Sequence, residues 1–348
     1  FDPWFIAQFR RIIAGEEDAK KNGLENIAAL KRLGLSDARL AQLTKTTETD
    51  VRKKREAAGV RPTFACVDTC AAEFPGQTPY IYATWESETD DAAKPTTGKK
   101  KVIVLGAGPN RIGQGIEFDY CCVHGIAAAR ELGFEAIMIN SNPETVSTDY
   151  DIADRLYFEP LTLEDVLAIC QTEKPDGVLV QLGGQTPLKL SKALAANGVK
   201  LLGTSADAID RAEDRGRFDE LLGKLGIQRP ASATGRNRAE VHAAAAKLGF
   251  PVLVRPSYVL GGRAMKIAHD PKELDEHFDR MFDAARFEND DAVILVDRFL
   301  DDAIEVDVDC VADGERVVIG AVMEHLERAG IHSGDSATIL PPFTLGAD

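Results

Sequence analysis

Two arginines and a pair of glycines occur close together in the stretch "VRPSYVLGGRAMK", which runs from Val254 to Lys266. The apolar run before it predicts a strand that delivers Arg255, followed by a Pro-Ser turn. A guanidinium can bind two phosphate oxygens at once, and Gly261-Gly262 would let a backbone flap approach a polyphosphate closely. The stretch therefore favours a phosphate-binding site, and a β-hairpin with a Gly-Gly turn is the structural alternative.

Acidic residues alternate with apolar ones in a second stretch, "VDRFLDDAIEVDVDC". The spacing predicts that Glu305, Asp307 and Asp309 share one face of a strand. Carboxylates in that arrangement could bind ribose hydroxyls or lie near a metal, and a solvated strand face is the alternative. The loop that follows, "ERAGIHSGDSATILPP", is too polar to be core, which makes it a candidate part of the same site.

A glycine-rich turn, "VLGAGPNRIGQG", follows an apolar run and looks at first like a dinucleotide-binding turn. That motif requires G-x-G-x-x-G and an acidic residue at the end of the next strand. Here the third glycine comes two residues late, and the next predicted strand, "EAIMIN", ends in Asn140. The residues alone leave two other readings open: a small-anion or interface turn to which Arg111 adds charge, and a tight turn without a ligand.

Composition limits the kinds of partner. The chain has 348 residues with 41 Lys and Arg against 56 Asp and Glu, a formal net charge of −15, so it has no overall attraction for nucleic acid or an anionic membrane. No apolar run approaches the roughly 18 to 20 residues of a membrane helix, and "FDPWFIAQFRR" lacks the order of a signal peptide. The expected location is the cytoplasm. Cysteines and histidines show no zinc-site spacing, which indicates reduced thiols and no histidine-built metal site.

Three zones of sequence pattern predict a multidomain α/β protein. Residues 1 to about 60 show helical spacing and capping residues, and residues 85 to 100 form a polar linker. From 100 to about 205, short apolar runs alternate with helical segments, which predicts a doubly wound parallel sheet. From about 215 onward the pattern favours an α+β domain with a largely antiparallel sheet, including a hairpin turn at Asp313-Gly314.

The helical zone contains a possible DNA-binding helix-turn-helix, "LSDARLAQLTKTTETDVRKKREAAGV". The segment ends in a basic run from Arg52 to Arg55. Residues 1–62 hold only four more basic than acidic residues, however, and a DNA footprint usually concentrates charge on one face. A helical packing and subunit-contact module is therefore the favoured interpretation.

Several stretches together resemble the large subunit of carbamoyl-phosphate synthetase, in its second, C-terminal synthetase half. They are "GPNRIGQGIEFDYCCVHG", "NSNPETVSTDYDIADRLYFEPLTLEDVL", "QLGGQTPLKL", "GTSADAIDRAEDR", "VRPSYVLGGRAM" and "IHSGDSA", and they span residues 95 to 348 in the family's order. "FDPWF" and "VDTCAAEF" extend the likeness to residue 1.

The resemblance implies a fold and an activity. Residues 1–93 would be the later part of a helical oligomerisation domain, 94–214 a Rossmann-like pre-ATP-grasp domain, and 215–348 the first part of an ATP-grasp domain. The family's second half is an ATP-dependent ligase that phosphorylates carbamate to carbamoyl phosphate for arginine and pyrimidine biosynthesis. Its cofactors are ATP with Mg²⁺ or Mn²⁺. The implied partners are the small glutaminase subunit, bicarbonate-derived carbamate and further copies of the chain, with neither nucleic acid nor membrane.

The resemblance also assigns residues by position. Arg215 and Arg255 would bind the nucleotide phosphates under the Gly261-Gly262 flap, and both arginines would act in catalysis together with His332. The opening turn would then belong to a domain that resembles a dinucleotide fold and binds no dinucleotide, with its Asn-Arg insertion at a domain interface and substrate tunnel.

The adenine and ribose would be held by Arg298, Leu300 and Glu305, although some members of the family carry histidine where Arg298 stands. The loop implied to line the nucleotide and carbamate pocket comprises Gly330, Ile331, His332 and Ser333.

One departure concerns the metal, because the family's magnesium ligands would lie beyond Asp348, so none is expected within this chain. The chain then looks like a fragment that binds ATP weakly and catalyses little on its own. Two alternatives remain open. Another ATP-grasp ligase, such as a biotin-dependent carboxylase, would share the arginine, the flap and the acidic strand, and a catalytically incomplete piece could serve in assembly.

Overall fold

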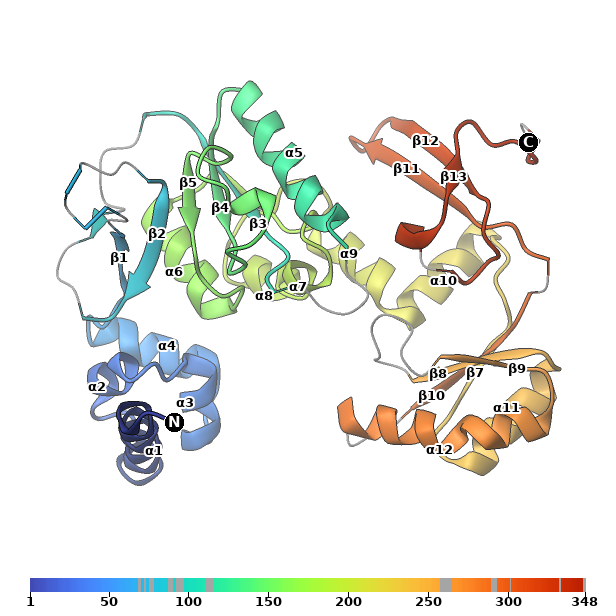
Figure 1. Cartoon of the computed structure of the whole chain (residues 1–348), viewed down its shortest axis with the longest axis horizontal. Helices are drawn as coiled ribbons and strands as arrows, with labels where there is room; N and C mark the ends of the chain where they lie inside the picture. Colours follow the sequence, from blue (N-terminus) through green and yellow to red (C-terminus); the bar gives the residue numbers. More distant parts are fainter. Residues whose placement is uncertain are drawn as a thin grey trace. The chain divides into compact units, whose positions relative to one another are not determined.

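The computed structural model describes residues 1–67, 70–71, 73–74, 78–86, 90–91, 97–109, 115–256, 265–288, 293–300, 302–331 and 333–346, without the side chains of residues 215 and 284–288. The chain divides into two compact units, one made of most of residues 1–219 and the other of residues 220–348 (Figure 1). No helix among the described residues is both long and apolar enough to cross a bilayer.

Four helices begin the first unit, and three of them, α1, α3 and α4, begin at a residue whose side chain caps the helix. Asp2 accepts a hydrogen bond from the N–H of Trp4, Ser36 accepts one from Arg39, and Thr47 forms a capping box with Asp50. Their inward-facing leucines, isoleucines and valine form a small core. The helices are α1 (Pro3–Asn22), α2 (Ile27–Arg32), α3 (Asp37–Thr44) and α4 (Glu48–Ala57).

A six-stranded sheet forms the centre of the first unit, in the order β1-β2-β5-β4-β3-β6. The four strands β5, β4, β3 and β6 run parallel, as does β2 beside β5, whereas β1 pairs antiparallel with β2. The sequence pattern did not predict β1, β2 or the short β5. The bounds are β1 (Thr63–Cys66), β2 (Tyr80–Thr84), β3 (Lys101–Leu105), β4 (Glu135–Ile139), β5 (Arg155–Tyr157) and β6 (Gly177–Leu179).

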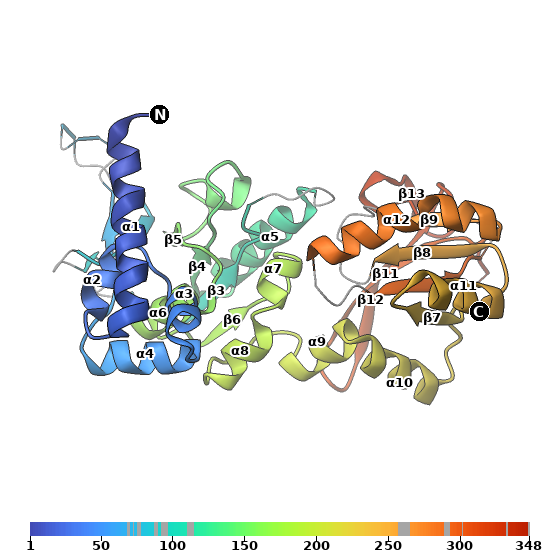
Figure 2. The same cartoon turned by 90° about the horizontal axis from the view of Figure 1, so that it is seen from below.

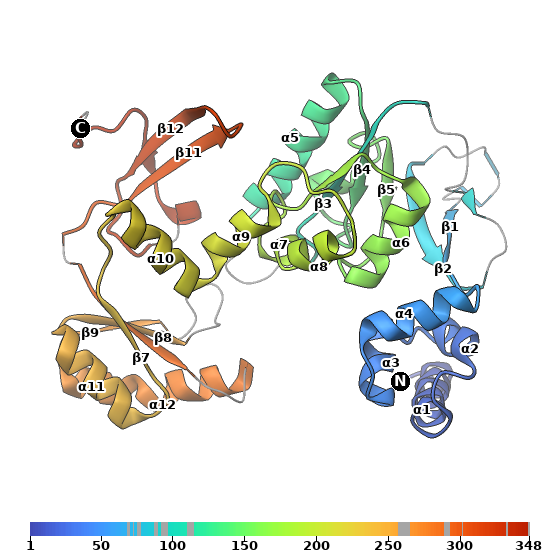
Figure 3. The same cartoon turned by 180° about the vertical axis from the view of Figure 1, so that it is seen from behind.

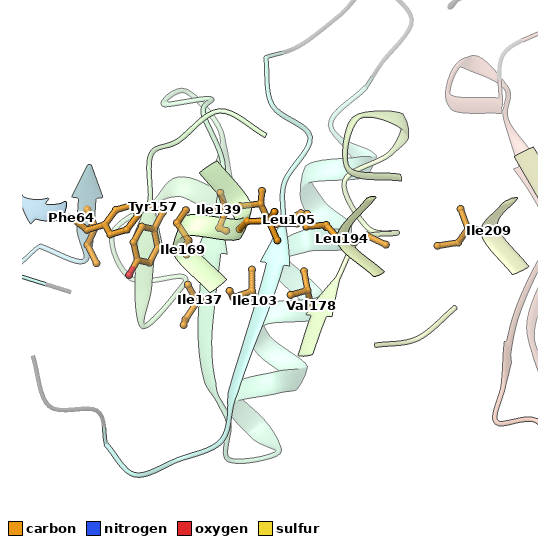
Figure 4. Packing of buried hydrophobic residues seen from close by; sticks show 14 residues of the cluster. Phe64, Ile103, Leu105, Ile137, Ile139, Tyr157, Ile169, Val178, Leu194 and Ile209 are labelled. Carbon is orange, nitrogen blue, oxygen red and sulfur yellow. The ribbon is translucent and has the colours of Figure 1, made fainter. Parts of the chain in front are cut away.

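Helices cover both faces of this sheet, which explains the unbroken apolar run of β3. Ile103 and Leu105 pack on one side with the cluster that includes Leu194 of α8 (Figure 4), and Val102 and Val104 pack on the other side. Successive residues of a strand point to opposite faces, so every residue of β3 is buried. The remaining helices of the unit are α5 (Glu117–Glu131), η2 (Val146–Thr148), α6 (Leu163–Glu173), α7 (Gln185–Leu188), α8 (Ser191–Ala196) and α9 (Ala206–Glu213).

The backbone of the glycine-rich turn after β3 lies so close to neighbouring atoms that a side chain would not fit at two of its glycine contacts. A Cβ on Gly183 would lie 2.4 Å from the backbone oxygen of Gly106, and one on Gly106 would lie 2.5 Å from Cγ of Asn140. The fully buried Asn140 accepts a hydrogen bond from the N–H of Gly108 at 3.0 Å and donates one to Ser147 at 3.2 Å. The polar residue at the end of β4, where a dinucleotide fold has its ribose-binding acid, is thus engaged in holding the turn.

A buried charged cluster joins the N-terminal helices to α6. Asp37 is fully buried and accepts hydrogen bonds from Lys31 at 3.1 Å and from Arg55, whose Nη2 lies 2.9 Å away. Glu164 of α6 completes the cluster by pairing with Lys31 and accepting the N–H of Asp37 at 2.7 Å. The rings of Trp85 face both cations, 4.7 Å from Lys31 Nζ and 5.1 Å from Arg55 Cζ. Two of the four basic residues in the run of α4, Arg52 and Arg55, are thus buried, and Lys53 and Lys54 are exposed.

The two adjacent cysteines of α5 differ in their surroundings. Cys122 is fully buried and its thiol lies 3.6 Å from the backbone oxygen of Leu105, whereas Cys121 is exposed. Burial raises the pKa of the Cys122 thiol to about 12, which keeps it protonated and unreactive at neutral pH. This environment agrees with a packing role for Cys122.

Two sheets and two helices form most of the second unit. The four-stranded sheet β7-β10-β8-β9 is antiparallel, and Figure 1 shows α11 and α12 on one of its sides. The hairpin β11–β12 turns at Asp313-Gly314 as predicted and pairs with β13. The bounds are α10 (Arg215–Leu225), which spans the boundary of the units, β7 (Ser232–Gly235), α11 (Arg238–Leu248), β8 (Val252–Pro256), β9 (Lys266–Ala268), α12 (Pro271–Glu288), β10 (Ile294–Arg298), β11 (Val306–Ala312), β12 (Val317–His325), η3 (Ser333–Asp335) and β13 (Thr338–Ile339).

Glu159 gives the first unit a testable pH dependence. Its buried carboxylate accepts a hydrogen bond from the N–H of Ala83, and burial raises its pKa from 4.5 to about 7. A carboxyl group with a raised pKa in the folded state favours folding in its neutral form, so its contribution is lost as the pH rises from about 4.5 to about 7.

We expect Glu159→Gln, which keeps an acceptor and removes the charge, to abolish this part of the pH dependence. The difference should be on the order of 2 to 3 kcal/mol in the free energy of unfolding between pH 4.5 and 8. Urea unfolding of both proteins at several pH values measures it. Parallel pH profiles for the two proteins would contradict the prediction.

Candidate functional site

Five segments of the second unit surround a cavity of about 890 Å³. They are strands β8 and β9, the first turns of α12, the segment after β10 and the loop after β12. A cavity of this size is within the roughly 300 to 1,000 Å³ typical of sites for small molecules and cofactors. The predicted site residues that line it are Leu300, Gly330 and Ile331.

The floor of the cavity is the uncovered face of the four-stranded sheet. Leu253 of β8 pairs with Ile267 of β9, and both side chains line the cavity. Val252 and Val254, which alternate with Leu253, pack instead into the core formed with α11 and α12. The helices thus cover one face of the sheet and leave an apolar surface on the other.

The beginning of α12 places charged groups at the cavity. Asp270 accepts hydrogen bonds from the N–H groups of Lys272 at 2.8 Å and Glu273 at 2.9 Å, ahead of Pro271. This helix was not predicted from the sequence, although Asp270-Pro271 is the same start signal that Asp2-Pro3 gives α1. The cavity residues that went unpredicted with it are Glu273, Glu276 and His277, and His269 precedes the helix.

Glu305 is tied to the loop that closes the cavity. Its Oε2 accepts the N–H of Gly330 at 3.1 Å, and its backbone oxygen accepts the N–H of His325 at 3.0 Å. Gly330 has a φ of 96°, in the left-handed region that favours glycine. The geometry therefore brings Glu305 next to the lining residues Gly330 and Ile331.

Arg255 lies on the same face of the sheet as the cavity floor. Its Nε is 3.3 Å from Oδ2 of Asp297 on β10, and the side chain is 41% exposed. Both atoms are buried, and neither makes a hydrogen bond with the described residues, so charge alone holds this pair. The guanidinium is therefore available to bind a further anion, although it is not among the residues that line the cavity.

The side chains of two other predicted residues do not line the cavity. Arg298, the last residue of β10, pairs with Val252, so its exposed side chain starts from the helix-covered face. Ser333 begins η3 and is exposed. Neither lines the cavity.

Further predicted residues fall partly or wholly outside the described part of the chain. Arg215 is the first residue of α10 and belongs to the other unit, and its side chain is not described. Gly261, Gly262 and His332 lie outside the described residues.

The acidic residues around β11 do not act as one group. Glu305 precedes the strand and contacts the loop, and Asp307 is 3.1 Å from Nε2 of the buried His325. Asp309 is exposed, next to a bulge in the pairing with β12. Among the described residues no three His, Cys, Asp or Glu side chains gather as a metal site would require. Of the three, Glu305 is thus the one bonded to the cavity loop, and Asp309 has the surroundings of a solvated strand.

Three family profiles match the chain in succession. Residues 1–59 match the carbamoyl-phosphate synthetase large chain oligomerisation domain, 98–211 the carbamoyl phosphate synthase preATP-grasp domain, and 214–348 the carbamoyl-phosphate synthase L chain ATP binding domain. Among solved structures of the same fold are the biotin carboxylase domain of Hydrogenobacter thermophilus 2-oxoglutarate carboxylase and the biotin carboxylase of Campylobacter jejuni. They are 20% and 16% identical, each with a TM-score of 0.52, and cover 65% and 66% of this chain and 50% and 52% of theirs.

Much higher sequence identity links the chain to curated large chains. The carbamoyl phosphate synthase large chain of Gemmatimonas aurantiaca is 57% identical over 349 residues, which are 99% of this chain and 31% of the relative. That of Pasteurella multocida is 54% identical over 352 residues, 100% of this chain and 32% of the relative. The chain thus spans about a third of the length of these relatives, and it belongs to the carbamoyl phosphate synthase large-chain family.

Proposed function

We propose that the cavity holds the adenosine of ATP, and that the chain contributes this site to the half of the enzyme that phosphorylates carbamate. One observation supports this most directly. Leu300, Gly330 and Ile331 line the same cavity, and Glu305 accepts a hydrogen bond from the loop that closes it. A carboxylate at that position can accept hydrogen bonds from ribose hydroxyls, and the apolar floor suits a purine ring. The biotin carboxylase domain with the same fold was solved with MgADP, ADP and bicarbonate.

In the proposed reaction a carbamate oxygen attacks the γ-phosphorus of ATP, and the bond to the bridging oxygen breaks to release ADP. Arg255 would neutralise charge on the phosphates, because its guanidinium lies on the cavity side of the sheet and has no hydrogen-bonded partner among the described residues. Arg215, His332 and the Gly261-Gly262 flap are proposed to complete the phosphate site. Mg²⁺ or Mn²⁺ would bind the ATP phosphates.

The rest of the proposal concerns the protein's setting. We propose the domain limits 1–93, 94–214 and 215–348, with the helices serving oligomerisation. The proposed partners are a small glutaminase subunit and bicarbonate-derived carbamate, in a cytoplasmic enzyme that serves arginine and pyrimidine biosynthesis.

The reverse reaction tests the proposed activity. In the full-length natural chain, carbamoyl phosphate and ADP with Mg²⁺ should yield ATP, and biotin should have no effect on ATP turnover. A folded protein that binds ADP but forms no ATP would contradict carbamate as the substrate. Stimulation of ATP turnover by biotin would favour the carboxylase alternative instead.

Gly330 allows a matched test of the closing loop, because Gly314 in the β11–β12 turn has the same φ of 96°. Alanine at either position should cost about 1 to 2 kcal/mol of backbone strain. We expect Gly330→Ala to raise the KM for ADP about tenfold, because strain of that size at the site displaces the N–H that holds Glu305. Gly314→Ala should leave the KM unchanged, and equal KM values in the two variants would contradict the assignment of the loop.

A further inference from the structure

A second cavity, of about 520 Å³, lies in the first unit and is lined by residues of α4, the end of α6 and the segment that follows α8. Figures 2 and 3 label these three helices. Two contacts across it fix these elements together. Nη2 of Arg52 donates to Oδ1 of Asn197 at 2.5 Å, and Nε2 of Gln171 donates to Oε1 of Glu56 at 2.9 Å. We call it the junction groove, and its charged and amide lining residues include Arg52, Lys53, Glu56, Lys174, Asn197 and Lys200.

Arg52 is the unusual residue of the junction groove. It is only 9% exposed, yet among the described residues its one hydrogen-bond partner is the neutral amide of Asn197, and it forms no ion pair with them. Arg55, one turn further along α4, is by contrast bonded to both carboxylate oxygens of Asp37. A buried guanidinium is normally paired with an anion, because desolvation of its charge is otherwise costly.

Nearby carboxylates do not supply that anion. Among the described residues, Glu48 makes neither a hydrogen bond nor an ion pair with Arg52, whose side chain bonds to Asn197. Glu56, the acidic residue in the lining, accepts its hydrogen bond from Gln171. Arg52 therefore faces the cavity with donors that no described carboxylate takes up.

The surrounding charges make the junction groove attractive to anions. Lys53, Lys174 and Lys200 line it together with Arg52, against one carboxylate from Glu56. The C-terminal ends of α6 and α8 lie beside Lys174 and Asn197, and two helix ends contribute about one further negative charge. A local balance of about two positive charges remains, in a chain whose net charge is −15.

We propose that the junction groove binds a phosphate-bearing small molecule, with Arg52 holding phosphate oxygens in a bidentate manner and the three lysines surrounding them. The volume is large enough for a diphosphate together with an organic group. Because the bound phosphate would contact α4 and the segment after α8 at once, it would stabilise the packing of the helical region on the α/β region. This site is separate from the proposed ATP cavity, which lies in the other unit.

Inorganic pyrophosphate is a suitable probe, in the full-length natural chain carrying Arg255→Ala to weaken binding at the proposed ATP site. Calorimetric titration at constant ionic strength gives the affinity, and hydrogen exchange of residues 52–56 and 197–200 locates the bound probe. The matched pair Lys53→Gln and Lys54→Gln removes one charge at neighbouring exposed positions of α4, of which only Lys53 lines the groove.

We expect pyrophosphate to slow exchange in both segments. Lys53→Gln and Lys200→Gln should each weaken binding at this site about three- to tenfold, whereas Lys54→Gln should change it less than twofold. Arg52→Lys should also weaken binding, because a lysine cannot provide the bidentate contact.

Unchanged exchange in these segments at millimolar pyrophosphate would overturn the proposal. So would equal losses in the Lys53 and Lys54 variants, which would indicate general charge attraction. Slow exchange of both segments before any probe is added, with no further change on addition, would show that another part of the full-length chain fills the groove, and would also overturn it.

Discussion

Replacing Arg255 with alanine is expected to lower the rate of ATP synthesis from carbamoyl phosphate and ADP about 10²- to 10³-fold in the full-length natural chain. Arg255 is placed on the cavity side of the sheet by β8, and within the described part of the chain its one partner is the charge of Asp297. Its interaction with the phosphates should strengthen as charge moves toward the transferred group, so the loss should fall mainly on kcat.

Arg236→Ala provides the control, because Arg236 is an exposed arginine of the same unit, outside the cavity lining. It should retain the full rate. A loss of less than threefold in Arg255→Ala, with the protein folded, would remove Arg255 from the proposed phosphate site.

The second large effect is expected in stability. Asp37→Ala should lower the free energy of unfolding of the first unit by about 3 to 5 kcal/mol, because it leaves Lys31 and Arg55 buried with one acceptor fewer for each. The ring of Trp85 lies over both cations, so its fluorescence should report the change directly.

Chemical unfolding followed through Trp85 measures this effect, with Trp4→Phe as background to remove the second tryptophan of the chain. The control is Asp50→Ala, which removes an exposed carboxylate from the capping box of α4 and should cost about 1 kcal/mol. Similar losses for the two variants would show that the buried cluster does not determine the stability of this unit.

Local signals predicted some elements fully. Helix α6 covers the residues that its pattern predicts, Leu163–Glu173, because Thr162 caps it and its apolar residues recur at helical spacing. Strand β3 was also predicted, because its unbroken apolar run from Val102 to Leu105 is typical of a strand buried on both faces.

Elements that depend on distant partners were missed. Strand β2 pairs with β5 through only Tyr80–Leu156 and Ile81–Tyr157, and β5 has three residues, too few for a period to show. Helix α12 carries so many charged residues that its apolar positions, among them Leu274 and Phe278, were not recognised as a helical stripe.

The residues of the candidate site also include some that could be predicted from the sequence and some that could not. Family likeness indicated Leu300, Gly330 and Ile331, and the structure places them around one cavity. It could not indicate His277, which reaches the cavity from α12, nor the face of the sheet from which the side chain of Arg298 starts. Strand register decides that face, and register depends on pairing partners rather than on the local sequence.

The central claim is that ATP binds in the cavity formed by β8, β9, α12 and the two loops. The most direct test is a structure of the full-length natural chain with ADP, Mg²⁺ and carbamoyl phosphate. We expect a nucleotide whose base lies between Leu253 and Ile331 and whose ribose hydroxyls are within hydrogen-bond distance of Glu305. A cavity that stays empty while nucleotide is bound elsewhere in the chain would contradict it.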